Sequence, residues 1–435
     1  MKAYGVGGQP LYLKVYEYYK EQIEDGRLPP GARMPSIRKC ACQLAVSRTT
    51  AQSAYFQLAA DGYLVPRPRS GYYVTDLAAE RAAAPAPGPA QAPAPARYDF
   101  VSMAVDEQSF DFALWSRYVK SALRQSGNLL SYGEPQGEPE LRRALCGYVR
   151  EQRAAVCDEE QIVVGAGVQS LLHLLCPLLP RGQSYQFEGE HFPQGAVVLH
   201  DHGLTPAPRE QAGLLYVMPS RITRRGGMMT TQQRLALLEQ ARGRGQLLLE
   251  DDYDNEFCYF TRPTPSLQGL AGGEGVVYLG TFSRLLVPSL RLSFLILPPS
   301  LLPAYRRRRD WYNQTVPKTE QMALCQFIRD GRLQSQARRL RRLYLRKSGE
   351  LVQTLAAVLP AGARAAVGES GPYVHLQLPA GVAAARVAAA ARERGVRVRP
   401  VAEDALLLGC TAVHSADFPE AARRLAAAVE SQLER

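Results

Sequence analysis

A short polar stretch near the N-terminus carries side chains suited to contacting DNA. It reads Ser47-Arg48-Thr49-Thr50 and begins a run with helical periodicity. Ser47 is a favoured helix N-cap, and the free amides of a first helical turn attract phosphate. Arg48 can donate two hydrogen bonds to a guanine edge, while Thr49 and Thr50 can face bases in the major groove. A capped helix with one arginine is more often an ordinary surface helix, so the neighbouring elements must decide.

The elements around this stretch predict a winged helix-turn-helix. A first helix is indicated by apolar residues at helical spacing, namely Leu11, Val15, Tyr18, Tyr19 and Ile23. Ser36 is the expected N-cap of a second helix through Leu44, and the third helix runs from Ser47 to Gly62. Two β-rich runs then flank residues 66–71, which predicts a basic hairpin. The third helix would enter the major groove, and hairpin arginines Arg67 and Arg69 would contact the adjacent backbone or minor groove.

The charge and the length of the chain bear on its possible partners and on its number of domains. The chain has 435 residues and a formal net charge of +11, and residues 1–75 hold ten Lys/Arg against five Asp/Glu. This balance permits a polyanionic partner without proving one. A chain of this length exceeds a single core, so we expect at least two domains. No long uncharged apolar run or secretion signal is visible in the sequence, and we therefore expect a cytoplasmic protein without a membrane segment.

Cysteine and histidine spacing gives little support for a metal site. The eight cysteines are scattered, and the one tight pair, Cys40 and Cys42, falls inside a predicted helix. His200-Asp201-His202 lacks a further ligand cluster nearby in the sequence, so a plain turn is favoured over a metal-binding pair. We predict neither a metal site nor a disulfide framework.

An Ala/Pro-rich segment divides the chain into two folded parts. Residues 78–97 have no hydrophobic period, which is typical of a semi-rigid spacer. The predicted domains are therefore residues 1–77 and 98–435. The second alternates short apolar runs with amphipathic helices, which favours an α/β sheet.

Residues 31–74 resemble the GntR-type DNA-binding domain. The positions that carry the resemblance are Arg38, Ser47, Arg48, Thr50, Tyr55, Leu58, Gly62, Tyr63, Leu64, Gly71 and Val74. Met34 and Cys40 replace usual leucines, which are conservative core changes, and Arg69 replaces a wing glycine. Together with the helix and hairpin signals, the resemblance gives a predicted DNA-binding set: Ser36, Arg38, Ser47, Arg48, Thr49, Thr50, Tyr55, Arg67, Arg69 and Gly71.

The large domain resembles fold-type I aminotransferases, and its place behind a GntR-type head resembles the MocR subfamily of regulators. The matching motifs are Phe112–Arg117 with Trp115, YGEPQGEPELRRAL at 132–145, GAGVQS at 165–170, EDDYDNEF at 250–257 and GTFSRLLVPSLRLSFLILP at 280–298. The expected architecture is an N-terminal winged helix-turn-helix followed by an aminotransferase-like α/β domain that depends, in its relatives, on pyridoxal 5'-phosphate (PLP).

The resemblance also implies a cofactor pocket. It places Asp251 at the pyridinium nitrogen and Tyr253 at the ring hydroxyl, with Phe192 stacked near the ring. Ser283 and Arg291 match phosphate contacts, and the turn after Gly165 presents amides to an anion. The complete predicted set is Tyr132, Gly167, Val168, Gln169, Phe192, Asp251, Tyr253, Thr281, Ser283 and Arg291.

Arg284 is the main departure from this pattern. It stands where the family has the lysine that bonds covalently to PLP, and a guanidinium with a pKa above about 12 offers no neutral amine. None of Lys120, Lys318 and Lys347 lies in a cofactor motif. We therefore expect no catalytic residue and no ordinary aminotransferase activity.

Three further departures agree with relaxed catalysis. The subfamily's P-S-H-Q-F-P-T-G is replaced by residues 219–226, which bring in Arg221, Arg224 and Arg225. The C-terminal R-L-G becomes Leu407-Leu408-Gly409, which removes the arginine for a substrate carboxylate. Gln336 takes the place of the usual histidine before the basic run at 338–342.

The sequence thus predicts a cytoplasmic, homodimeric transcription regulator that binds double-stranded DNA. Its large domain would supply dimerisation and a pocket for noncovalent PLP or another small anionic effector, unless PLP binding is lost. A working PLP-dependent aminotransferase and a structural protein that no longer binds DNA remain the alternatives.

Overall fold

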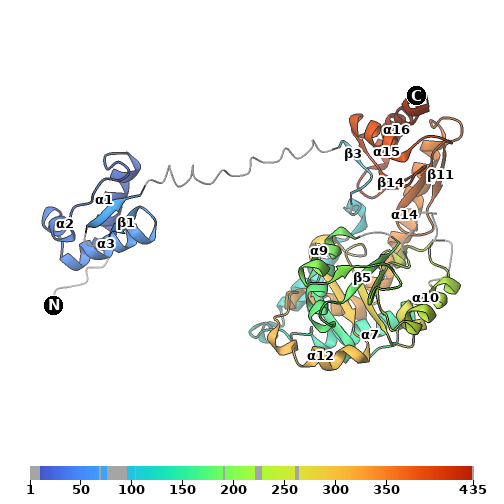
Figure 1. The fold of residues 1–435 in the computed structure, drawn as a ribbon, viewed down its shortest axis with the longest axis horizontal. Coiled ribbons are helices and arrows are strands. Elements are labelled where there is room, and N and C mark those ends of the chain that lie inside the picture. Colours follow the sequence, from blue (N-terminus) through green and yellow to red (C-terminus); the bar gives the residue numbers. More distant parts are fainter. Residues whose placement is uncertain are drawn as a thin grey trace. The chain divides into compact units, whose positions relative to one another are not determined.

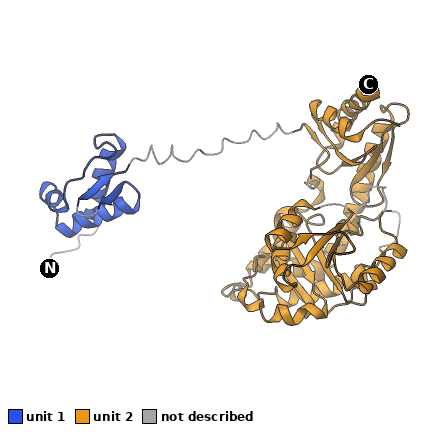
Figure 2. Ribbon diagram, in the orientation of Figure 1, with its two compact units in different colours: residues 1–95 blue, residues 96–435 orange. Residues whose placement is uncertain are grey.

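The computed structural model describes residues 10–67, 70–75, 96–102, 104–189, 192–220, 228–259 and 264–433. The chain divides into two compact units, Met1–Pro95 and Ala96–Arg435 (Figure 2). Most of the spacer predicted at 78–97 lies outside the described residues, as do Arg69 and residues 221–226.

The first unit contains three helices and a two-stranded hairpin, as the sequence predicts. The elements are α1 (Leu11–Glu24), α2 (Ile37–Gln43), α3 (Arg48–Ala60), β1 (Leu64–Arg67) and β2 (Gly71–Val74). Ser36 caps α2 by accepting from the Lys39 amide, and Ser47 caps α3 by accepting from the Thr50 amide at 3.0 Å. Ala45 has a φ of 50°, a left-handed conformation that reverses the chain between α2 and α3.

The core of this unit lies between α1, α3 and the hairpin. Its buried residues are Val15, Tyr19, Ile23, Met34, Cys40, Ala51, Ala54, Tyr55, Leu58, Leu64 and Val74. Leu11 and Tyr18, which share the helical spacing of α1, are exposed. The apolar face of α1 is therefore narrower than the sequence pattern indicates.

The second unit is built on a seven-stranded sheet in the order β4-β10-β9-β8-β7-β5-β6. Only β10 runs antiparallel to its neighbours. The strands are β4 (Ile162–Ala166), β5 (Ser184–Glu188), β6 (Thr205–Pro206), β7 (Leu214–Val217), β8 (Leu247–Asp251), β9 (Val276–Thr281) and β10 (Leu292–Ile296). The central strands are apolar and buried almost throughout, as expected for a sheet covered on both faces.

Helices pack on both faces of this sheet (Figure 1). Ile162 and Val164 of β4 join the core under α5, α7 and α13, whereas Val163 joins the core under α8 and α9. The helices of this region are α5 (Phe112–Leu123), α6 (Ser126–Leu129), α7 (Pro139–Arg153), α8 (Val168–Leu175), α9 (Pro193–Asp201), α10 (Thr231–Gly243), α11 (Leu267–Leu270), α12 (Leu302–Arg306) and α13 (Lys318–Arg329).

A smaller subdomain follows at the C-terminal end of the chain, where Figure 1 shows α15 and α16 beside the second sheet. That sheet has four antiparallel strands in the order β11-β12-β15-β14. Its elements are α14 (Arg332–Ala356), β11 (Arg364–Val367), β12 (Tyr373–Gln377), α15 (Ala384–Glu393), β14 (Arg399–Ala402), β15 (Ala405–Gly409) and α16 (Phe418–Leu433). The entering chain adds β3 (Tyr98–Asp99), which pairs with β13 (Val396–Arg397).

Within the described ranges, no helix combines the length and the apolar character needed to cross a bilayer.

Candidate functional site

The N-terminal turn of α3 presents the predicted DNA-reading residues on the surface of the first unit. Arg48 and Thr49 are exposed, and Thr50 is half-buried. The Ser47 hydroxyl lies 2.8 Å from that of Thr49 and 2.7 Å from that of Thr50, so the three hydroxyls form one connected group. The turn therefore offers an arginine, a hydroxyl cluster and free helix amides on one surface, a combination that suits phosphate and base contacts.

The hairpin holds its described arginine in a defined orientation. Arg67 pairs with Gly71 at the end of the hairpin, and its guanidinium lies 4.4 Å from the centroid of the Tyr73 ring. Stacking of this kind leaves the guanidinium edge able to donate to phosphate. Gly71 has a φ of 105°, which an L side chain rarely adopts. Gly71 thus shapes the hairpin through its backbone.

Tyr55 has a different position from the one that a DNA-contact role requires. Its side chain is fully buried, and its hydroxyl donates to the Pro35 carbonyl at 2.9 Å. Because a buried ring cannot touch DNA, its assignment to the DNA-binding set is corrected here to a supporting one. The bond fixes the residues that lead into Ser36, while Ser36 and Arg38 themselves are exposed.

A cavity of about 250 Å³ opens at the carboxyl ends of β4, β8 and β9 in the second unit. This edge is where open α/β sheets bind their ligands. Nine of the ten predicted cofactor residues line it: Gly167, Val168, Gln169, Phe192, Asp251, Tyr253, Thr281, Ser283 and Arg291. Gln194 and Met218 complete the lining; the sequence analysis did not select them because neither belongs to a charged or glycine-rich motif.

One end of the cavity is suited to an anion. Gly167 precedes α8 with a φ of 87°, and a Cβ built there would lie 2.2 Å from an Arg291 guanidinium nitrogen. The positive φ favours glycine, and the missing side chain lets the Arg291 guanidinium lie close to the Gly167 backbone at the start of α8. The Thr281 hydroxyl lies 3.0 Å from the Ser283 hydroxyl and accepts from that of Ser293 at 3.0 Å. Arginine, hydroxyls and amides together form the usual donor set for a phosphate.

Another part of the cavity lining is aromatic and acidic. Phe192 lies 5.9 Å from Tyr216, ring centroid to centroid, and the Tyr216 hydroxyl donates to Asp251 at 2.7 Å. Asp251 is buried, while Tyr253 is half-buried at the cavity wall. A flat ring with a basic nitrogen would meet a carboxylate in this part of the lining and a phosphate site at the anion end.

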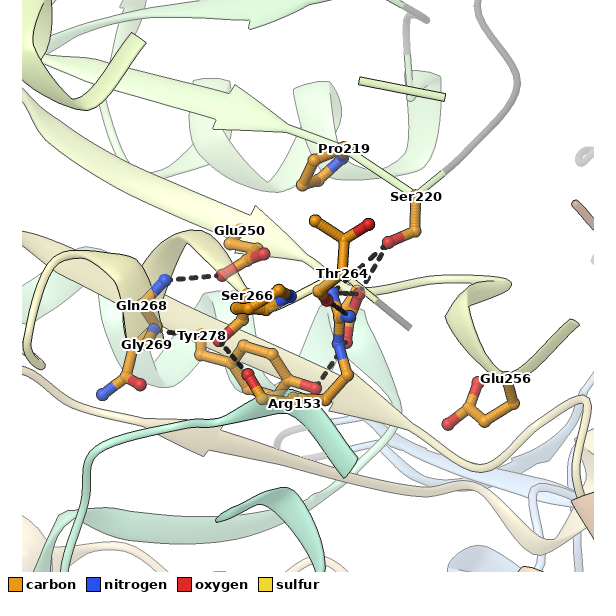
Figure 3. Close-up of polar contacts among 12 residues, drawn as sticks. Arg153, Pro219, Ser220, Glu250, Glu256, Thr264, Ser266, Gln268, Gly269 and Tyr278 are labelled. Carbon is orange, nitrogen blue, oxygen red and sulfur yellow. Dashed lines mark hydrogen bonds and ion pairs between the residues drawn. The ribbon is translucent and has the colours of Figure 1, made fainter. Parts of the chain in front are cut away.

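A buried network of ion pairs and hydrogen bonds around Arg153 fixes the acidic motif at 250–257 (Figure 3). Arg153, at the end of α7, donates to both Asp252 carboxylate oxygens at 2.6 and 2.9 Å and also to the Thr264 carbonyl. Asp252 further accepts from Tyr278 at 2.6 Å and from Ser220 at 3.1 Å. The neighbouring carboxylates Asp251 and Asp252 thus have separate partners, one at the cavity and one in the scaffold.

Arg284 is buried beside the cavity and is held by three groups. Its Nε lies 2.9 Å from the Tyr253 hydroxyl and 3.2 Å from Asp254, and its Nη2 donates to the Tyr373 hydroxyl at 2.6 Å. Burial alone would lower the pKa of Arg284, but Asp254 and the two tyrosines outweigh it and raise the pKa above its ordinary value. The side chain is therefore a fixed cation.

Comparison with known proteins connects this geometry to a family. Residues 11–74 match the family described as bacterial regulatory proteins, gntR family. Over 96% of both chains, the protein is 34% identical to the uncharacterized HTH-type transcriptional regulator YdeL of Bacillus subtilis. It is also 31% identical to the probable rhizopine catabolism regulatory protein MocR of Rhizobium meliloti, over 77% of this chain and 75% of that one.

The chain belongs to the MocR-type family of GntR transcriptional regulators. Among solved structures, the alpha-aminoadipate aminotransferase LysN of Thermus thermophilus superposes with a TM-score of 0.63 and 24% identity, covering 77% of this chain and 92% of that one. This likeness confirms the aminotransferase-like fold of the second unit.

Two positions that the sequence analysis interprets as departures from the family pattern, Gln336 and Leu407, have described contacts in the second unit. Gln336 donates to the carbonyls of Ser109 and Leu285 at 2.6 and 3.0 Å, so it anchors the residue next to Arg284. Leu407 is buried in β15 opposite Arg399 of β14. Leu407 and Arg399 line a small cavity of about 20 Å³ that Arg284 also lines, which is room for about one water molecule.

Tyr132 is the one predicted cofactor residue that the structure leaves outside the cavity. Its side chain is 99% exposed in the single chain. The contacts of Asp254 and Tyr373 with Arg284 were missed by the sequence analysis, because Tyr373 lies 89 residues from Arg284 along the chain. Asp254 did have a local signal, since it belongs to the same acidic motif as Asp251.

Proposed function

We propose that this regulator uses the cavity in its second unit to bind PLP, or a similar phosphorylated ring, without a covalent bond and without catalysing transamination. Ligand binding would alter DNA binding by the first unit, in a cytoplasmic homodimer. The observation that carries the proposal is the combination of an anion-binding cavity with a buried arginine, Arg284, whose guanidinium is engaged by Tyr253, Asp254 and Tyr373. The sequence resemblance implies that Arg284 stands where relatives carry a lysine.

The residues present fit PLP at both ends. Gly167, Ser283 and Arg291 would hold the phosphate, and Asp251 would pair with the pyridinium nitrogen, while Phe192 would lie near the ring. When bound to an enzyme, PLP supplies an electron sink for reactions of amino acids. Here the chain binds and orients such a ring but offers no amine for covalent attachment.

The contacts of Arg284 favour binding over catalysis. Its guanidinium is engaged by Asp254, Tyr253 and Tyr373, so it neither loses a proton nor moves freely toward a ligand. Leu407, which the sequence resemblance places at the position of a carboxylate-binding arginine, offers no charge-assisted contact to an amino-acid substrate. Both changes leave the phosphate end of the cavity intact.

Calorimetry with the full chain tests this proposal. We expect PLP to bind the wild-type protein, pyridoxal without the phosphate to bind much more weakly, and Arg291→Gln to lose most of the PLP affinity. After borohydride treatment with PLP, mass spectrometry should find no pyridoxyl adduct on wild type but an adduct on residue 284 of Arg284→Lys. An adduct on any wild-type lysine, or equal binding of pyridoxal and PLP, would refute the proposal.

The DNA contacts are tested with operator DNA from the region flanking the gene. Arg48→Ala should cost about 1–3 kcal/mol and relax sequence choice if Arg48 contacts a guanine. Arg67→Ala and Arg69→Ala should weaken all sequences alike and reduce the salt dependence of binding. Unchanged affinity in all three variants would contradict the assigned DNA surface.

A further inference from the structure

A second polar cavity is lined in part by the acidic motif at 250–257, which also contains Asp251. It measures about 230 Å³ and is lined by residues of α7, of the 3₁₀ turn Asn255–Phe257 and of α14. Its polar lining residues include Gln152, Asn255, Glu256, Gln334, Arg338 and Arg341. It shares no lining residue with the cavity at Arg291, so it is a separate site.

Two arginines give this cavity an unbalanced positive charge. Arg341 donates from Nε and Nη2 to the Glu256 backbone carbonyl at 3.1 and 2.9 Å, which orients its guanidinium at the cavity. Arg338, four-fifths of a helical turn earlier on α14, bonds to the Ser335 hydroxyl at 3.0 Å. Neither arginine forms an ion pair with any residue in the described part of the chain.

Buried hydrogen-bond acceptors without a partner are a second, independent feature of this cavity. Asn255 is 4% exposed, and its Oδ1 finds no hydrogen-bond partner among the described residues; the same holds for Oε1 of Gln334. Buried polar atoms are nearly always bonded to protein, water or ligand, so these two call for a donor. Burial, reinforced by Asp252, raises the pKa of Glu256 to about 8, which keeps its carboxyl group largely uncharged near neutral pH. The charge of the arginines is therefore not cancelled from within the cavity.

We propose that this cavity binds a small carboxylate that also carries a hydrogen-bond donor, such as an amino acid or a hydroxy acid. Arg338 and Arg341 would hold the carboxylate, and rotation of the Asn255 and Gln334 amides would turn their buried, unpaired oxygens toward the amino or hydroxyl group. Asn255 follows Asp254, the carboxylate partner of Arg284, so a ligand here would act on the same turn that borders the first cavity.

Calorimetric titration of the full chain with L-glutamate, L-malate and succinate tests the site. Glutamate or malate should bind, and succinate, which lacks the donor, should bind at least tenfold more weakly because the buried acceptors stay unpaired. Arg338→Gln and Arg341→Gln should each weaken binding at least tenfold. Arg342→Gln, on the same helix but outside the cavity, should leave it unchanged, and so should Arg291→Gln in the first cavity.

Several outcomes would overturn the proposal. They are no binding of any probe at millimolar concentration, equal affinity for succinate, equal affinity for inorganic phosphate, or binding that Arg291→Gln removes. If Arg341→Gln fails to fold because the Glu256 carbonyl loses its donor, Arg338→Gln still tests the proposal. Among the described residues, the Arg338 guanidinium hydrogen-bonds to Ser335 alone, so this change should leave the fold intact.

Discussion

Replacing Asp252 by Asn should destabilise the second unit strongly. Asp252 and Arg153 have side chains that are each 2% exposed, and the guanidinium donates to both carboxylate oxygens. Asparagine keeps the shape but removes the negative charge and turns an N–H donor toward other donors. Removing one partner of a buried ion pair costs about 3–5 kcal/mol, because the remaining charge has no compensation. This is a large part of the roughly 5–15 kcal/mol that stabilises a typical domain.

Tryptophan fluorescence during unfolding in guanidinium chloride measures the loss of stability of the second unit. The chain has two tryptophans, Trp115 and Trp311, and both lie in the second unit. With a slope of roughly 4 kcal/mol/M, the expected loss lowers the unfolding midpoint by about 1 M. Glu159→Gln, which breaks an exposed pair with Arg143, is the matched control and should leave the midpoint almost unchanged. An Asp252→Asn midpoint equal to that of the control would refute the reasoning.

Two further predictions concern the cavities. Gly167→Ala forces a Cβ against the Arg291 guanidinium at a φ that disfavours side chains. PLP binding measured by calorimetry should be lost, while the free energy of unfolding measured by fluorescence should fall by only about 1–2 kcal/mol. Retained PLP affinity would contradict the assignment of the anion-binding residues. Glu256→Gln tests a pH effect: the pKa of Glu256 rises from 4.5 to about 8 on folding, so the folded chain binds its proton more tightly and stability should fall between about pH 5 and 8. The variant should flatten that fall, and an unchanged pH profile would be evidence against a raised pKa of Glu256.

Local signals were enough to predict the first unit. Ser36 and Ser47 are N-caps because their side chains reach amides three residues ahead, an interaction contained within four residues of sequence. The turn at Ala45 and the hairpin around residues 66–71 are equally local. The exposure of Leu11 and Tyr18 could not be predicted in this way, because it depends on how much of α1 the other elements cover.

The second unit shows where sequence patterns stop being informative. Nine of the ten residues that the family motifs predict for a cofactor site line one cavity, although they are far apart in the sequence. The partners of Arg153 and Arg284 were not predicted, since Asp252 lies 99 residues from the first and Tyr373 lies 89 residues from the second. Buried charges must have partners, but the sequence alone does not say which residues of the fold supply them.

The acidic motif at 250–257 is therefore weaker evidence for cofactor chemistry than its resemblance implies. Asp252 is bound to Arg153, and Glu250 accepts from the amides of Leu267 and Gln268 at 2.8 and 2.9 Å. These carboxylates would be retained for stability even in a chain that had lost PLP, because each leaves a buried donor unpaired when removed. The best evidence for a ligand site comes from residues whose contacts shape the cavity and do not stabilise the fold. Gly167 is the clearest of them, since its φ of +87° favours glycine and the nearest atoms to a Cβ built there belong to the guanidinium of Arg291, which lines the cavity.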